Sequence, residues 1–201
     1  PPERELAPRM QISRSVVNDG LAEMARKGFL DTSPRQGTVV ADFHRNGTLE
    51  ILVAIMSYNG GRLPREDIRA ILEMRGVLMA FALESAIPLI TPEQLRQLHE
   101  QSEAFARAKE PEDAAELIFE FDHMLSGFSG NTLLPLFFCS FQTPIKELWK
   151  RYVSRNGVGI LKKRNDELLE CVARKDAAAA KRVIADSIAE TISGRTEIYG
   201  G

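Results

Sequence analysis

The sequence has little of what marks metalloproteins, disulfide-rich secreted proteins and membrane proteins. Its 201 residues include two cysteines, three histidines and one tryptophan. Cys139 and Cys171 lack the spacing of metal ligands, and we interpret them as buried thiols of a reducing cytoplasm. The most apolar stretch, 133–138, is interrupted by Pro135 and is too short to span a bilayer. The sequence therefore predicts a cytoplasmic protein that does not enter a membrane.

Signs of catalysis are also missing. The sequence has no glycine-rich phosphate loop, no histidine-based triad and no nucleophile with a partner at a recognisable spacing. The net charge of −2 is close to zero, so overall charge does not indicate a nucleic-acid partner either. We expect that the protein is not an enzyme, and any basic surface must be local.

What the sequence does have is concentrated in its first 41 residues. A helical segment up to residue 7, a turn, a second helical segment that begins at residue 12, and a short hairpin from 29 to 40 follow one another. Helix, turn, helix and basic β-hairpin in this order predict a winged helix-turn-helix. Such a domain usually places its second helix in a DNA major groove.

The start of the second helix is the predicted DNA-reading end. Ser13 is placed to cap the helix, because its hydroxyl can accept from a free N–H of the first turn, and the same end favours a phosphate. Arg14 and Ser15 lie at the end that enters the groove. Arginine suits a guanine edge, and Asn18, one turn on, suits adenine.

The hairpin supplies the rest of the predicted DNA surface. Gly37 permits the turn of the wing, Arg35 at the tip suits a phosphate or minor-groove contact, and Thr38 follows. Arg4 lies on the first helix. The alternative is that these arginines form only a solvated face. The order of the motifs favours DNA binding.

These motifs resemble the DNA-binding domain of the GntR family of bacterial transcription regulators. The resemblance rests on Glu-Leu-Ala at 5–7, on Ser-Arg-Ser at 13–15 and on Gly-Thr-Val-Val at 37–40. It implies a further helix before residue 1. The second helix departs from the family's Thr-Val-Arg-Glu-Ala-Leu, because Asn18 replaces an arginine and Gly20 weakens the helix by about 1 kcal/mol relative to alanine. The DNA sequence that relatives bind therefore does not carry over.

From residue 46 onward nearly the whole sequence reads as amphipathic helix. We expect a DNA-binding domain at 1–45 and an antiparallel bundle of six to seven helices at 46–201, so the fold class is mostly α with a small β wing. The predicted helices are 48–58, 65–86, 92–109, 111–128, 131–153, 157–174 and 176–198.

This layout resembles the ligand-sensing domain of the FadR subgroup of the GntR family. The matches are Glu73-x-Arg75 in the long second helix of the bundle and Ser-Gly-Asn at 129–131. Most members of the subgroup resemble one another in an Asp and three His that bind a metal. The corresponding positions here hold Ile118, Asp122, Asn165 and Asp186.

None of these positions holds a histidine, so we expect no transition-metal cofactor. A hard cation held by the oxygens of Asp122, Asn165 and Asp186 is an open alternative. A second alternative is that Asp122 pairs with an Arg or Lys of the bundle.

Loss of the metal ligands resembles the fatty-acid-responsive branch of the subgroup, whose ligand is a long-chain acyl-CoA. The apolar side chains available to line a tunnel are Ile118, Phe121, Met124, Phe128, Phe137, Phe138 and Phe141. The last helix lacks that branch's polar and Trp pattern. Plain core packing is the other interpretation of this cluster.

Arg75 is the strongest candidate for an effector contact. It lies mid-helix in an apolar stretch, and a buried arginine needs an anion. That anion is either a ligand's carboxylate or phosphate, or an internal carboxylate such as Asp122. The predicted effector-binding residues are therefore Arg75, Asp122, Asn165 and Asp186.

We expect a homodimeric transcription regulator that binds a palindromic operator, as repressors of this type do. A small acidic metabolite in the bundle, an acyl-CoA among the options, would shift the spacing of the two DNA-binding units through the linker at 42–48. The alternatives are a small carboxylate sensed with or without a metal, and DNA binding with no effector.

Overall fold

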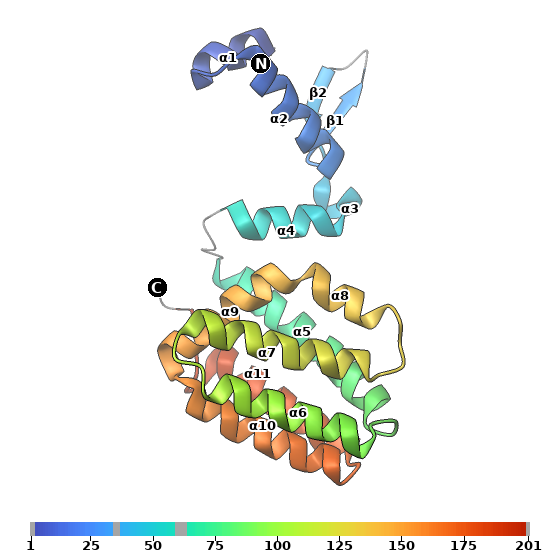
Figure 1. Cartoon of the computed structure of the whole chain (residues 1–201). Coiled ribbons are helices and arrows are strands. Elements are labelled where there is room, and N and C mark those ends of the chain that lie inside the picture. The colour runs from blue at the N-terminus through green and yellow to red at the C-terminus, as the bar shows by residue number, and fades with distance from the viewer. Residues whose placement is uncertain (1–2, 34–36, 59–63, 200–201) are drawn as a thin grey trace. The chain divides into compact units, whose positions relative to one another are not determined.

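The structure, a computed structural model, describes residues 3–33, 37–58 and 64–199. The chain forms two compact units, 1–60 and 61–201 (Figure 1). The sequence predicts a boundary between residues 45 and 46. In the structure α4 (Leu49–Tyr58) is part of the first unit.

The first unit has the predicted order of helix, turn, helix and hairpin. Its elements are α1 (Glu3–Met10), α2 (Arg14–Lys27), β1 (Leu30–Ser33), β2 (Gly37–Val40), α3 (Phe43–Asn46) and α4. The two strands pair antiparallel, from Leu30 opposite Val40 to Ser33 opposite Gly37. The winged helix-turn-helix topology is therefore confirmed.

The core of this unit is small. Ala7 of α1 packs away from solvent with Val17 of α2, each 5% exposed. Met24, although it lies further along the same helix, is not part of this core, since 43% of its surface is exposed. The buried face of α2 runs through Val17 and the half-buried Leu21, and Met24 lies outside it.

Helix α2 ends at a left-handed glycine. Gly28 has φ +89°, and its N–H bonds to the carbonyls of Ala25 and Met24, which closes the last turn. Ile51 of α4 packs so closely that a β-carbon on Gly28 would lie 3.1 Å from Ile51 Cδ1. This contact joins the end of α2 to α4.

The second unit consists of seven helices within the described residues. They are α5 (Arg65–Ala86), α6 (Pro92–Ala106), α7 (Pro111–Gly127), α8 (Leu134–Ser140), α9 (Gln142–Asn156), α10 (Val158–Ala173) and α11 (Ala177–Ser193). Contacts run from α5 to α7, α6, α10, α11 and back to α5, so these five helices close a ring, and α9 packs on α7 (Figure 1). The predicted helical bundle is confirmed.

The sequence predicts one helix over 131–153, and the structure has two. The chain breaks at Phe141, which leaves the helical region at φ −103° and ψ 9°. Pro144 explains the break, because it has no N–H to donate to the carbonyl of Ser140 and its ring would clash with that carbonyl. Helix α9 therefore starts afresh just before the proline.

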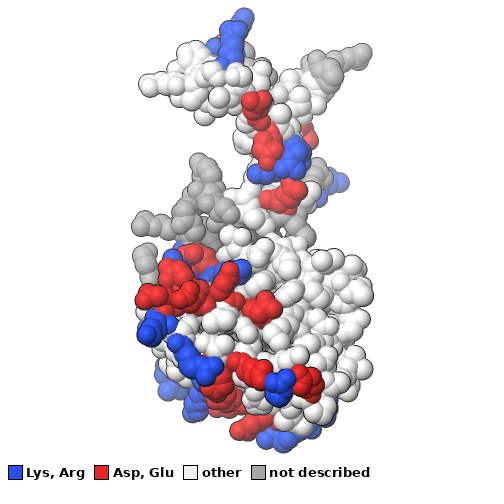
Figure 2. All heavy atoms as spheres, in the orientation of Figure 1, with Lys and Arg blue, Asp and Glu red and all other residues white. Residues whose placement is uncertain are grey.

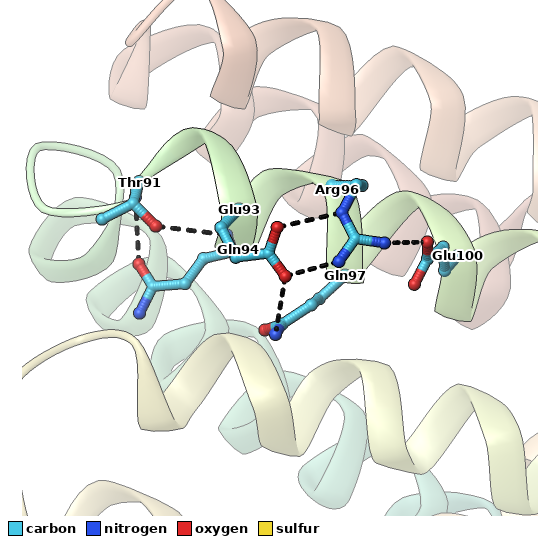
Figure 3. Close-up of polar contacts among 6 residues, drawn as sticks. All are labelled: Thr91, Glu93, Gln94, Arg96, Gln97 and Glu100. Atoms are coloured by element: carbon cyan, nitrogen blue, oxygen red, sulfur yellow. Dashed lines mark hydrogen bonds and ion pairs between the residues drawn. The ribbon is translucent and has the colours of Figure 1, made fainter.

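Helix α6 begins as the sequence predicts. Thr91 Oγ1 accepts from the Gln94 N–H at 3.2 Å, and Gln94 Oε1 accepts from the Thr91 N–H at 2.9 Å (Figure 3). This is a reciprocal capping box with Pro92 in the first turn. None of the described helices combines the length and the apolar character that crossing a membrane takes.

Candidate functional site

The leading end of α2 presents the predicted DNA-reading side chains. Ser13 Oγ accepts from the Val16 N–H at 3.3 Å, so the predicted cap is formed. The hydroxyl of Ser15 lies 2.9 Å from that of Ser13. Arg14, Ser15 and Asn18 are all exposed. The helix N-terminus and its polar side chains thus face solvent together, which suits a phosphate and base edges.

The wing lies next in the chain. Gly37 has φ +75°, so the turn conformation that the sequence predicts there is present. Thr38 is exposed and pairs with Thr32 across the hairpin. Arg4 of α1 is exposed as well. Arg35 lies outside the described residues.

An ion-pair cluster joins α2 to α4 within the first unit. Arg26 donates to Glu23 at 2.8–2.9 Å and to Glu50 at 3.1 Å. Its guanidinium, helped by Lys27, lowers the pKa of the Glu23 carboxyl from 4.5 to about 2. These groups are exposed, so the pairs are expected to contribute little to stability.

Inside the second unit, Arg75 meets Asp122. Arg75 Nε and Nη2 donate to the same oxygen, Asp122 Oδ2, at 3.0 and 2.7 Å. The guanidinium also lies over the ring of Trp149, 4.5 Å from its centroid. Burial raises the pKa of the Asp122 carboxyl, and Arg75 opposes that rise. Arg75 thus pairs with an internal carboxylate, which is one of the two anions that the sequence allowed for it.

The pair lines a cavity at the centre of the helix ring, here called the polar cavity. It encloses about 430 Å³ free of protein atoms, some of it open to solvent, and its enclosed part has room for only a few water-sized groups. Its polar lining comes from Arg75, Asp122, Trp149, Arg164, Asn165 and Ser187, and its apolar lining from Phe105, Ile118, Phe121, Leu161, Leu168, Val183 and Ile184.

Arg164 is a second cation of the polar cavity that the sequence did not reveal. Its Nη1 donates to Tyr152 Oη at 3.2 Å and to Ser187 Oγ at 3.1 Å, and Nη2 donates to Glu190. In the sequence it follows Lys162 and Lys163, and such a basic run usually indicates a solvated face. No local signal distinguishes it from its neighbours.

A second cavity, here called the apolar cavity, shares part of its lining with the polar cavity. Arg75, Trp149 and Ser187 line both cavities. The remaining lining is Ile71, Leu72, Ile145, Leu148, Tyr152, Ile188, Thr191 and Ile198, around about 390 Å³ that includes space open to solvent. The Arg75–Trp149 stack therefore borders both a charged compartment and a largely aliphatic one.

The other two predicted effector residues differ in position. Asn165 is buried in the polar cavity lining, and its Nδ2 donates to Ser102 Oγ at 2.9 Å. Asp186 is exposed on α11 and does not line the cavity. Across the described residues no three His, Cys, Asp or Glu side chains gather as metal ligands would.

The aromatic cluster divides between several roles. Ile118 and Phe121 line the polar cavity, whereas Phe138 is fully buried in the core. Phe137 is 45% exposed on α8. The chain from 124 to 145 holds no Lys, Arg, Asp or Glu, and Figure 2 shows an uncharged surface over α8. The cluster is mostly core and surface, and only part of it faces the cavity.

Comparison with known proteins places the chain in a family. The model of the FCD domain matches residues 70–190, which include both Arg75 and Asp122. The chain belongs to the FCD-domain family. The FCD match and the GntR motifs of the first unit together make this chain a GntR-family protein with an FCD domain. That family consists of transcription regulators and not of enzymes.

Relatives of this FCD-domain protein include a curated one from Shewanella pealeana, named fatty acid metabolism regulator protein. The two are 30% identical over 158 residues, which cover 77% of this chain and 63% of the relative. The chain thus matches less than two thirds of the length of that relative.

Solved structures share the fold of this FCD-domain protein. A GntR-family regulator from Pseudomonas syringae has a TM-score of 0.58 at 19% identity, covering 98% of this chain and 75% of that one. Lar of Listeria monocytogenes, described as controlling expression of the agr system, has a TM-score of 0.63 at 15% identity, with 94% of this chain and 83% of that one covered.

Proposed function

We propose that this protein is a DNA-binding transcription regulator that reads an inverted repeat as a homodimer and responds to a small acidic metabolite. The observation that carries the DNA-binding part is the capped, exposed end of α2. Arg14, Ser15 and Asn18 are exposed there, in a unit that also holds the two-stranded wing and in a chain of the FCD-domain family. A helix N-terminus of this kind positions the protein on phosphates and leaves side chains for base edges.

Apolar surface on α8 supports the homodimer. Leu133, Leu136 and Phe137 are 60%, 61% and 45% exposed, within a stretch of chain that carries no charge. Contiguous apolar surface on a folded protein marks interaction sites. A second copy offers the same uncharged face, as a two-fold interface requires.

The polar cavity is the proposed effector site. Arg75, Arg164, Asn165 and Ser187 offer donors to a carboxylate or phosphate inside the FCD domain. The name of the Shewanella relative favours an acyl-CoA. The cavity as folded is too small for a long acyl chain, so such a ligand requires the helices to move apart, and a short carboxylate needs less movement. The latter, with or without a hard cation, is the second candidate.

Selection from a pool of random duplex DNA with the purified full chain tests DNA binding. We expect the selection to recover an inverted repeat. The association constant for this DNA should fall steeply as the salt concentration rises. Arg14→Ala is expected to lose about 1–3 kcal/mol of affinity and to relax specificity at one base pair. Arg182→Ala, an exposed arginine of α11, is the matched control and should bind as the wild type does. Recovery of no common sequence would overturn the DNA-binding proposal.

Thermal unfolding against a panel of compounds tests the effector part. The panel holds acetate, octanoate, octanoyl-CoA and inorganic phosphate, each with and without Mg²⁺ or Ca²⁺. A ligand that binds only the native state stabilises it by about 2.7 kcal/mol at a hundredfold excess over its dissociation constant. A shift that needs the cation would favour the metal-assisted alternative. No shift with any member would favour DNA binding without an effector.

A further inference from the structure

We infer that Asp122 is a resident counter-anion of Arg75, which an acidic ligand displaces when it binds in the polar cavity. This inference rests on the proposed function, because it assumes that the cavity receives an acid. It assigns a competing role to Asp122, where the sequence suggested a ligand contact.

The geometry of the pair allows one anion to replace another. A guanidinium has five N–H donors, and Arg75 gives two of them to a single oxygen of Asp122. Arg75 Cζ lies 4.5 Å from the centroid of the Trp149 ring, so the ring contacts the guanidinium at its central carbon, whereas Asp122 accepts from its N–H groups. Arg75 is therefore held by the ring while its anion changes.

Energetics favour exchange over simple opening. The side chains of Arg75 and Asp122 are only 10% and 4% exposed, so an Arg75 without any anion would be strongly unfavourable. The desolvation of a buried pair offsets much of its attraction. A ligand carboxylate or phosphate that takes the place of Asp122 keeps Arg75 paired throughout. The displaced Asp122 carboxyl, whose pKa burial raises, can take up a proton, so neither group is left as an unpaired buried charge.

The surroundings indicate where the ligand's oxyanion would go. Arg164, Asn165 and Ser187 line the same cavity from α10 and α11. The indole N–H of Trp149 is buried close enough to the Asp122 carboxyl to lower its pKa, yet it makes no hydrogen bond of normal geometry among the described residues. An oxyanion between Arg75 and Trp149 would satisfy this donor, and an attached hydrocarbon would reach the apolar cavity, which the same two residues also line.

Trp149 is the only tryptophan of the chain, so its fluorescence reports on this site alone. The experiment titrates acetate, octanoate and inorganic phosphate into the full-length wild type, Asp122→Asn and Asp113→Asn. Asp113 is an exposed aspartate of the same helix and serves as the control. In the wild type the Asp122 carboxylate competes with the added oxyanion for Arg75, so the apparent affinity for the oxyanion is reduced to the fraction of molecules in which Asp122 has moved away. Asp122→Asn removes this competitor and should bind the active oxyanion at least about tenfold more tightly. Asp113→Asn should bind like the wild type.

A measurement on the wild type guards against an Asp122→Asn variant that fails to fold. The Nε–H resonance of Arg75, assigned by its loss in Arg75→Lys, should move when the oxyanion is added. If an oxyanion binds while this resonance stays in place and Asp122→Asn binds no more tightly, displacement is overturned and the effector site stands. If no oxyanion binds any of the proteins, the effector proposal and the displacement both fall.

Discussion

Arg75 and Asp122, 47 positions apart in the chain, are joined inside the helix ring by two hydrogen bonds to one carboxylate oxygen, at 3.0 and 2.7 Å. The pair links α5 to α7, and both residues line the polar cavity. Arg75 also stacks on the ring of Trp149. Its energetic role can be separated from its proposed role in ligand binding.

Replacing Arg75 by Met should destabilise the protein by about 3–5 kcal/mol, because Asp122 would remain buried without its cation. The double variant Arg75→Met with Asp122→Leu should recover most of this loss, since an apolar pair leaves no buried charge. Urea unfolding followed by circular dichroism gives both values. Equal losses in the single and double variants would show that the pair does not act as a unit.

The Ser13 cap can be separated from the DNA contact. Ser13→Ala should lower stability by about 1 kcal/mol, because the Val16 N–H loses its acceptor. Ser13→Asp keeps an acceptor and should retain stability, yet its negative charge should weaken DNA binding by repelling phosphate. Melting temperatures and anisotropy with the selected duplex test this. Stronger DNA binding by Ser13→Asp would place the DNA elsewhere.

Two glycines of the first unit should respond oppositely to alanine. Gly20 lies inside α2 with nothing within 4 Å of an added β-carbon, so Gly20→Ala should stabilise the protein by about 1 kcal/mol. Gly28 has φ +89° and lies against Ile51, so Gly28→Ala should destabilise it by about 1–3 kcal/mol. Thermal unfolding of the two variants decides. A neutral Gly28→Ala would mean that the end of α2 is not held against α4.

The Glu23 cluster predicts a pH dependence. The pKa of Glu23 is lowered from 4.5 to about 2, so its pairing stabilises the folded protein above pH 4.5. That contribution is lost as the pH falls from 4.5 through about 2, when the carboxyl takes up a proton. Because the pairs are exposed, the melting temperatures of the wild type and Glu23→Gln should differ only slightly above pH 4.5, and this small gap should close over the interval. A gap that stays constant down to pH 2 would argue against the pairing.

Local signals in the sequence predicted the local structure. The Ser13 cap, the Gly37 turn and the Thr91 capping box each depend on residues within a few positions of one another, so short patterns suffice to find them. The break at Phe141 was missed because the apolar periodicity continues across it, although Pro144 gave the signal.

The candidate effector site was predicted only in part. The position of Arg75 in an apolar stretch indicated that it needs an anion. The pairing with Asp122 depends on how α5 packs on α7, and the periodicity of the sequence does not reveal that packing. Arg164 reaches the cavity because the face of α10 that carries it points into the bundle. In the sequence it belongs to a basic run with Lys162 and Lys163, which resembles a solvated helix face. Asp186 was included by analogy of position, and in the structure it is exposed.

The most direct test of a regulator that couples an acid to DNA binding is the affinity for the selected duplex with and without a saturating oxyanion. Fluorescence anisotropy of the labelled duplex measures it, using an oxyanion that shifts the emission of Trp149. We predict an affinity change of about 5- to 150-fold, and an equal change in oxyanion affinity when DNA is bound, because coupling between two binding sites is reciprocal. Identical affinity in both conditions, with the oxyanion shown to be bound, would contradict the coupling.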